Sequence, residues 1–265
     1  MAPTSIAPAS TVPPVAELLA PAHWRTVDCI SDLHLQAAEP ATFAAWQRYM
    51  ASTTADAVFI LGDLFEVWVG DDGVDADPTG FDATCLQVLQ TASQQRPIFF
   101  MHGNRDFLFG QRAADACQLT LLDDPTVLQF AGQRWLLSHG DALCLDDVDY
   151  LQFRAMVRSP AWQSNFLAQP LAQRQQIARN IRSQSENRKH SGVVYADVDG
   201  PAACQWLAAA RARVLLHGHT HRPAQHALGT DLERWVLSDW DADATPPRGD
   251  ALRISFNGLV RIQIA

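Results

Sequence analysis

The chain has 265 residues, of which 48% are hydrophobic, and its formal net charge at pH 7 is −9. This length and apolar content suffice for a full buried core, so we expect one large domain, with or without an insertion. The acidic balance argues against a generic nucleic-acid-binding protein, because phosphate contacts need clustered Lys and Arg residues.

Residues 1–24 differ from the rest in composition. They contain several prolines, no Lys or Arg, and no apolar segment of signal-peptide length. This composition disfavours a secretion or import signal, and we interpret the segment as a flexible tail. Residues 25–265 then form the domain proper. No run in the chain approaches the ~20 apolar residues that cross a bilayer, so any membrane contact is expected to be peripheral.

Five apolar runs of strand length each lead into polar residues beside a Gly or Ser. Helices expected near residues 42–50 and 83–94 separate the first three runs. A carboxylate at the end of a buried strand needs a partner or a metal ion. The candidate ligands are Asp32 and His34 after residues 27–30, Asp63 after 58–61, Asn104 after 98–101, His139 after 135–138, and His219 and His221 after 214–216.

The segment from about residue 146 to 210 is expected to be a helical insertion. Its apolar residues recur at helical spacing, and Pro160 and Pro170 mark breaks between helices. Between Asp147 and His190 there are seven basic residues and only three acidic ones. In an acidic protein this local excess indicates the wall of an anion site.

The C-terminal part is expected to be rich in β-structure, with strands near residues 234–237, 252–256 and 260–264. Asn257-Gly258 between the last two is a strong signal for a two-residue hairpin. Helices interleaved with the early strands, followed by this β-rich end, predict a mixed α/β or α+β fold in which helices cover a pair of sheets.

The candidate ligands carry oxygen and imidazole donors, which suit Mn²⁺, Fe²⁺ or Zn²⁺. The five cysteines are odd in number and form no Cys-x-x-Cys pair, so neither a disulfide framework nor a thiolate zinc site is indicated, and a reducing compartment fits better. One carboxylate shared by two ions ~3.5–4 Å apart would activate a water for attack on a phosphoryl group. Each motif alone has an ordinary explanation as a cap or a turn; the ordered set of five favours the dimetal site.

The motifs Asp-x-His, Gly-Asp, Gly-Asn-Arg, His-Gly-Asp and Gly-His-x-His, in this order, resemble the calcineurin-like metallophosphoesterases. The resemblance implies a four-layer αββα sandwich, here with a helical lid insertion, and two metal ions, which we expect to be Mn²⁺. The implied ligands are Asp32, His34, Asp63 and His221 for one ion, and Asp63, Asn104, His139 and His219 for the other.

Four longer segments resemble one branch of this family, namely residues 62–72, 102–108, 139–147 and 217–223. The branch hydrolyses the pyrophosphate bond of a UDP-linked diacylated glucosamine lipid in lipid A biosynthesis. The resemblance therefore implies a cytoplasmic hydrolase, peripheral on the inner membrane, with that lipid as its substrate. We expect a monomer without a nucleic-acid partner. The alternatives are a dimetal phosphoesterase for another nucleotide or phosphodiester, and a non-catalytic scaffold that kept the fold.

The same resemblance assigns further roles. Asp63 and Arg105 are implied as catalytic, although Arg105 could also form an ordinary salt bridge in its loop. The lid residues could equally belong to a solvated helix face, and His190 stands where the branch carries a Lys, with Lys189 beside it. The implied substrate contacts are Asn104, Arg105, Asp147, Ser183, Asn187, His190 and His219.

Overall fold

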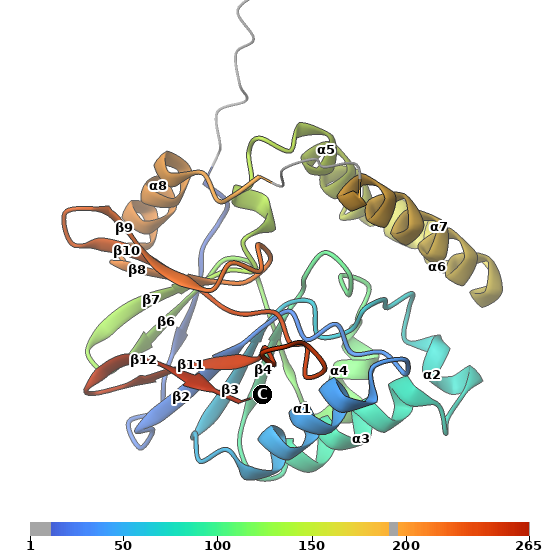
Figure 1. Ribbon diagram of the computed structural model, residues 1–265, viewed down its shortest axis with the longest axis horizontal. Coiled ribbons are helices and arrows are strands. Elements are labelled where there is room, and N and C mark those ends of the chain that lie inside the picture. The colour runs from blue at the N-terminus through green and yellow to red at the C-terminus, as the bar shows by residue number, and fades with distance from the viewer. Residues whose placement is uncertain (1–11, 191–195, 265) are drawn as a thin grey trace, which may run out of the picture.

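The computed structural model describes residues 12–190 and 196–264, with the backbone alone over residues 184–190. Two six-stranded sheets pack face to face, with helices outside both (Figure 1). The strands are β1 (Ala16–Leu19), β2 (Thr26–Ile30), β3 (Ala57–Leu61), β4 (Ile98–Met101), β5 (Thr120–Leu122), β6 (Thr126–Phe130), β7 (Gln133–Leu137), β8 (Val214–His217), β9 (Ala224–Gly229), β10 (Leu232–Val236), β11 (Asp250–Ser255) and β12 (Gly258–Gln263). The helices are α1 (Pro40–Ser52), α2 (Asp72–Ala76), α3 (Phe81–Ser93), α4 (Gln111–Cys117), the 3₁₀ turn η1 (Asp141–Leu143), α5 (Val148–Val157), α6 (Pro160–Leu167), α7 (Leu171–His190) and α8 (Gly200–Ala210).

Both sheets are mixed. The first has the strand order β1-β6-β7-β8-β10-β9, and the second has the order β12-β11-β2-β3-β4-β5. Strands β2, β3, β4 and β5 run parallel, as do β7, β8 and β10. The predicted hairpin at Asn257-Gly258 joins β11 to β12 as an antiparallel pair.

The core lies in layers, which explains the strongly apolar strands. All five residues of β3 are buried, and they alternate between the two faces of the sheet. Phe59 and Leu61 pack between the sheets, whereas Val58 and Ile60 pack under the helices outside the second sheet. The sequence of a strand that is covered on both faces is a continuous run of apolar residues. The expected αββα sandwich is confirmed.

Part of the segment predicted as a flexible tail is ordered instead. Residues 1–11 lie outside the described residues, but Ala16–Leu19 forms β1 and pairs in parallel with β6 at the edge of the first sheet. Val12 and Val15 pack against the cluster under α8. The prediction is therefore wrong for residues 16–19. A four-residue strand next to prolines carries too little pattern to be recognised, and its partner β6 is distant in the sequence.

The helical insertion is shorter than expected. Helices α5–α7 lie together at one side of the sandwich, and we call Val148–His190 the lid (Figure 1). Helix α8 instead forms the outer layer of the first sheet, because Trp206 and Leu207 pack into the cluster that also contains Leu136 and Leu215. The expected end at residue 210 is thus too late. Among the residues that the structure describes, no helix has both the length and the apolar character needed to cross a membrane.

Candidate metal centre

The seven predicted ligands converge at the ends of five strands. Each lies two to four residues beyond its strand, namely after β2, β3, β4, β7 or β8. Parallel strands end at the same edge of a sheet, so residues that follow different strands in the sequence lie close together in space. The backbone there is unusual, because five of the seven have positive φ angles: Asp32, His34, Asp63, His219 and His221. Such conformations are rare for residues other than Gly and cluster at functional sites.

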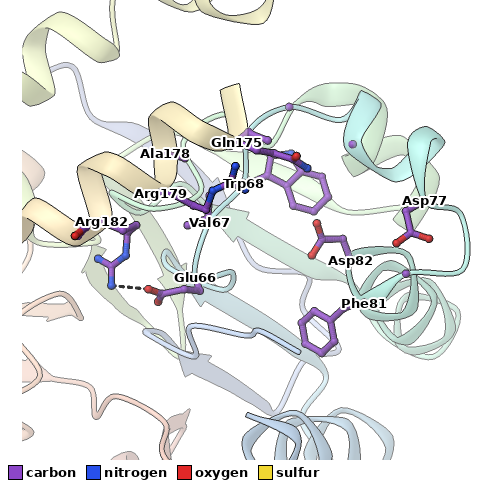
Figure 2. Close-up of a pocket in the computed structure, with 15 residues that line it drawn as sticks. Glu66, Val67, Trp68, Asp77, Phe81, Asp82, Gln175, Ala178, Arg179 and Arg182 are labelled. Atoms are coloured by element: carbon purple, nitrogen blue, oxygen red, sulfur yellow. Dashed lines mark ion pairs between the residues drawn. The ribbon is translucent and has the colours of Figure 1, made fainter. Parts of the chain in front are cut away.

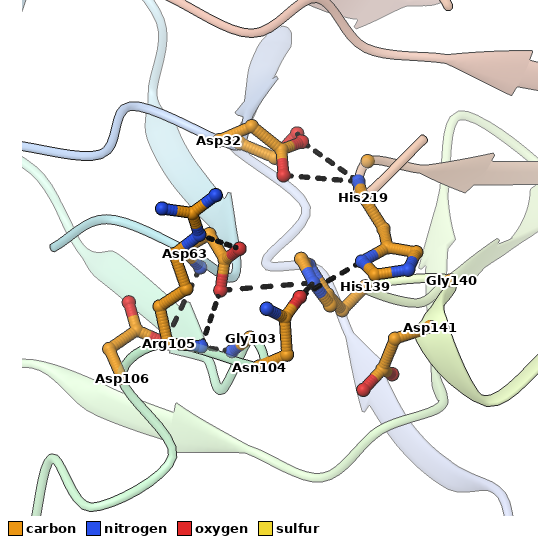
Figure 3. A network of polar contacts seen from close by, with 12 residues as sticks. Asp32, Asp63, Gly103, Asn104, Arg105, Asp106, His139, Gly140, Asp141 and His219 are labelled. Carbon is orange, nitrogen blue, oxygen red and sulfur yellow. Dashed lines mark hydrogen bonds and ion pairs between the residues drawn. The ribbon is translucent and has the colours of Figure 1, made fainter. Parts of the chain in front are cut away.

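Asp63 lies between two sets of ligands, of which Figure 3 shows the set with Asn104, His139 and His219. On one side, its Oδ1 is 3.8 Å from His139 Nε2. Asn104 Oδ1 completes this set, at 3.0 Å from His139 Nε2 and 2.9 Å from His219 Nδ1. On the other side, Asp63 Oδ2 is 4.0 Å from His34 Nδ1.

The second set contains Asp32, His34 and His221. The Nε2 atoms of the two histidines are 3.1 Å apart, and His221 Nε2 is 3.5 Å from Asp32 Oδ1. The backbone N–H of His219 donates to both oxygens of Asp32, at 3.1 and 2.9 Å. Potential ligand atoms of these three side chains lie within 4.8 Å of one another, as do those of Asp32, Asp63 and His139.

Burial keeps two of the imidazoles neutral. It holds the pKa of His34 well below its usual value, and the nearby Arg105 adds to this effect. Burial likewise lowers the pKa of His219 to about 4, helped by the adjacent His139. His139 differs: burial opposes its charge, but the carboxylates of Asp63, Asp141 and Asp32 raise its pKa to about 9. Its Nδ1 lies 2.9 Å from the carbonyl oxygen of Leu61, which leaves Nε2 facing the cluster. Neutral imidazoles such as those of His34 and His219 are the form that ligates metals, and an ion bound at Nε2 of His139 would displace the proton that the carboxylates favour there.

Two glycines leave room for the carboxylates. A Cβ on Gly103 would lie 2.0 Å from Asp63 Oδ1, and a Cβ on Gly218 would lie 2.2 Å from Asp32 Oδ2. Nearby, the buried Asp106 accepts from the backbone N–H groups of Gly103, Asp63, Leu64 and Phe65, at 2.7–3.3 Å. These contacts fix the loops that follow β3 and β4 to each other.

The donor set fits divalent cations. Within the part of the chain that the structure describes, oxygen and imidazole donors converge without a thiolate, and the glycines keep the cradle open on the side of Asp32 and Asp63. Buried carboxylates of this density require compensating positive charge. Asp63, placed between the two sets, is the residue that both ions would share.

Arg105 lies beside this cluster. Its backbone N–H donates to Asp63 Oδ1 at 2.9 Å, its Nε is 3.5 Å from Asp63 Oδ2, and its Nη1 pairs with Glu66 Oε2. The salt bridge that was the predicted alternative for Arg105 is therefore seen, together with proximity to Asp63, and it joins the loop after β4 to the loop after β3. The loop after β3 also reaches the lid, because Glu66 Oε1 is 2.5 Å from Nη2 of Arg182 on α7.

A cavity of about 570 Å³ lies between this loop and α7 (Figure 2). Its wall combines apolar side chains, including Trp68 and Phe81, with Glu66, Arg179 and Arg182. Ser183, predicted to contact the substrate, also lines it. The side chains of Asn187 and His190 lie outside the described residues, as does that of Lys189.

The remaining predicted residue, Asp147, caps α5, since its Oδ1 accepts from the backbone N–H of Tyr150 at 3.1 Å. Tyr150 stacks on His219, with ring centroids 5.8 Å apart, and its hydroxyl donates to the buried Asp141. Arg154 Nε donates to the same oxygen of Asp141 at 2.8 Å. Helix α5 is thereby attached to the metal centre.

Sequence reasoning missed three residues that organise the site: Glu66, Asp106 and Asp141. Each belongs to a recognised motif, so the signal of an acidic residue beside a ligand was present. Apart from Gly103, which is three positions before Asp106, the partners named above lie between 9 and 116 positions away in the chain, and no local pattern indicates such pairs.

The chain was compared with known proteins. The profile of the calcineurin-like phosphoesterases matches residues 25–223. A UDP-2,3-diacylglucosamine hydrolase from Chromobacterium violaceum is 48% identical over 239 residues, which cover 87% of this chain and 95% of the relative. A protein of the same name from an Enterobacter species is 41% identical, over 88% of this chain and 97% of the relative. Among solved structures, Vps29 from Entamoeba histolytica with Zn²⁺ gives a TM-score of 0.45 at 14% identity, and the match covers 91% of this chain and 99% of Vps29.

Proposed function

Since the chain belongs to the calcineurin-like phosphoesterases and, within them, to the family of the UDP-2,3-diacylglucosamine hydrolases, we propose that it hydrolyses the pyrophosphate bond of UDP-2,3-diacylglucosamine. The products are UMP and 2,3-diacylglucosamine 1-phosphate, and the reaction is a step of lipid A biosynthesis. The observation that carries the proposal is the position of the ligand cluster: Glu66, three residues after Asp63, lines one end of a partly apolar cavity, whose α7 wall supplies the positive charges of Arg179 and Arg182. Such a cavity suits a lipid that carries a diphosphate.

The seven clustered side chains would hold two divalent ions, which we take to be Mn²⁺, with Asp63 shared between them. When bound, such a pair lowers the pKa of a water and neutralises phosphoryl charge. The water oxygen forms the new bond to phosphorus, and the bridging oxygen leaves with the second phosphate. The leaving phosphate needs little protonation, because its second pKa is about 6. The chain therefore needs no covalent nucleophile.

Arg105 contributes positive charge at the point of attack. Its side chain is only 10% exposed and lies next to Asp63, so a charge contact with a phosphoryl oxygen would be strong there. Asn104 and His219 belong to both the ligand set and the proposed substrate contacts. Asp147, Ser183, Asn187 and His190 complete these contacts in the proposal, on the lid side.

Peripheral association with the cytoplasmic face of the inner membrane is also proposed, for a monomeric enzyme. Large apolar side chains are exposed on the lid, among them Met156 (50%) and Leu167 (42%). They occur on the lid, which also carries the basic surplus, and this combination favours anionic headgroups. Purified protein should co-float with vesicles that contain anionic lipid, and less so at high salt because salt screens the charges.

The direct test is turnover. Purified protein with Mn²⁺ should release UMP from UDP-2,3-diacylglucosamine, and the variant Asp63→Ala should not. UDP-glucosamine, which lacks the acyl chains, should turn over much more slowly. If the lipid stays intact while other nucleotides or phosphodiesters are hydrolysed, the chain is a dimetal phosphoesterase with a different substrate.

A further inference from the structure

We propose that Glu66 is a positioning residue whose single carboxylate joins the metal centre, Arg105 and the lid. The idea rests on the proposed function only where substrate turnover is measured. The contacts themselves involve three segments of the chain: the loop after β2, the loop after β4, and helix α7. Glu66 is 18% exposed, so its charge contacts are partly shielded from water.

The backbone places Glu66 beside the ligand loops. Pairing between β2 and β3 continues past the strand ends, as His34 N donates to Asp63 O at 3.0 Å and Leu35 N donates to Leu64 O at 2.9 Å. The backbone N–H of Glu66 then donates to Leu35 O at 3.2 Å. The position of its side chain is therefore set by the same ladder that sets Asp63 and His34.

The first contact is with His34. The imidazole lies between two neighbours, since its Nε2 faces His221 and its Nδ1 is 3.6 Å from Glu66 Oε2. This separation is an electrostatic contact and exceeds a hydrogen bond. A carboxylate behind a ligating imidazole favours the proton on Nδ1, and the lone pair of Nε2 is then available to an ion.

The second contact controls Arg105. This guanidinium lies between two carboxylates, with Nη1 on Glu66 Oε2 and Nε 3.5 Å from Asp63 Oδ2. Without the charge of Glu66, the remaining anionic neighbour of Arg105 in this group is Asp63, which both ions would share. Glu66 thus draws Arg105 away from Asp63, and Asp63 stays available to the metal ions.

The third contact reaches the lid. Glu66 uses its other oxygen, Oε1, for Nη2 of Arg182 at 2.5 Å (Figure 2). Arg105 and Arg182 carry like charges and would repel each other near one phosphate-binding position. A carboxylate between them compensates this repulsion and keeps both cations next to the cavity.

The test uses the isosteric variant Glu66→Gln in the full-length protein. Metal affinity is measured by titrating the metal-free protein with Mn²⁺ in a calorimeter. We expect the affinity to fall by ~10- to 100-fold, the usual effect of removing an outer-shell carboxylate. An affinity equal to that of the wild type would overturn the proposal, because a merely structural Glu66 need not influence the ions.

A double variant separates the two effects on the ions. If Arg105 competes for Asp63 once Glu66 is neutral, then adding Arg105→Ala to Glu66→Gln should recover most of the lost affinity. No recovery would show that Arg105 is not held away from Asp63 by Glu66, and this part of the proposal would be wrong.

Arg182→Gln tests the lid contact alone. Amide exchange of α7 should accelerate and KM for the lipid should rise several-fold, while Mn²⁺ affinity stays as in the wild type. A loss of metal affinity as large as that of Glu66→Gln would contradict the separate use of the two carboxylate oxygens. Because the metal titrations need no substrate, they remain decisive even if the lipid proves not to be turned over.

Discussion

The metal centre and the lid are held in place by different kinds of interaction. The ligands follow buried strands within four residues, and most of them adopt positive φ angles that the surrounding backbone imposes. The lid is attached through side chains instead: Arg154 pairs with Asp141, Arg174 with Asp72 and Arg182 with Glu66, and Phe166 packs into the core. Backbone placement gives the precision that coordination of ions requires.

The largest expected effect tests the precision of the backbone. In Gly103→Ala the new Cβ would lie 2.0 Å from Asp63 Oδ1 and 2.3 Å from Asp63 N, so one of the two loops must move. A shift of about 1 Å in such a site costs roughly 100-fold in rate. We expect at least that loss in UMP release, together with weaker Mn²⁺ binding.

A matched substitution near the lid is expected to be tolerated. A Cβ on Gly73 in α2 would meet only Leu171 Cδ1, at 3.8 Å. Gly73 also lines the cavity beside α7, so Gly73→Ala should leave Mn²⁺ binding and kcat unchanged and confine any change to KM, while the protein becomes slightly more stable, by up to about 1 kcal/mol. Equal losses of activity in the two variants would remove the contrast between the regions.

The same contrast explains what the sequence reveals. The ligands were predictable because a buried apolar run that ends in Gly-Asp or Gly-His-Thr-His is a local pattern. The strands β1, β5, β6 and β9 were not predicted, since they are short or alternate weakly, and their identity depends on partners elsewhere in the sheet. Glu66 and Asp141 escaped for the same reason: their roles depend on arginines that only folding brings near.

The next effect concerns the attachment of α7. Arg174 is 1% exposed, and its guanidinium donates to the carbonyl oxygens of Val69 and Gln169 and pairs with Asp72. Arg174→Met keeps the apolar stem but leaves these acceptors without their donor. We expect about 2 kcal/mol of local destabilisation, or roughly 30-fold faster amide exchange in α7, with a higher KM.

Exchange in β3 and β4 should stay slow in this variant, because the sandwich does not depend on Arg174. Gln173→Met, at the exposed neighbouring position, serves as the control and should change neither value. If Arg174→Met lowers the protection of the sheets as much as that of α7, the lid and the sandwich unfold as one unit.

The smallest effect concerns the ion pair that attaches the segment between the lid and α8 to the sandwich. Asp197, just before α8, pairs with Arg234 of β10 at 2.8 Å, and hydrogen bonds from this guanidinium lower the pKa of Asp197 to about 2.

Because the folded pKa lies below the unfolded value of about 3.9, the pair stabilises the protein above pH ~4 and loses this contribution as the pH falls toward 2. The side chain is 35% exposed, so solvent screening reduces the contribution to about 1 kcal/mol. Asp197→Asn should lower the urea midpoint at pH 7 and approach the wild type near pH 2. Asp199→Asn, which keeps the cap of α8, should match the wild type at both values. If Asp197→Asn differs from the wild type by the same amount at both pH values, the ion pair between Asp197 and Arg234 does not attach the segment before α8 to the sandwich.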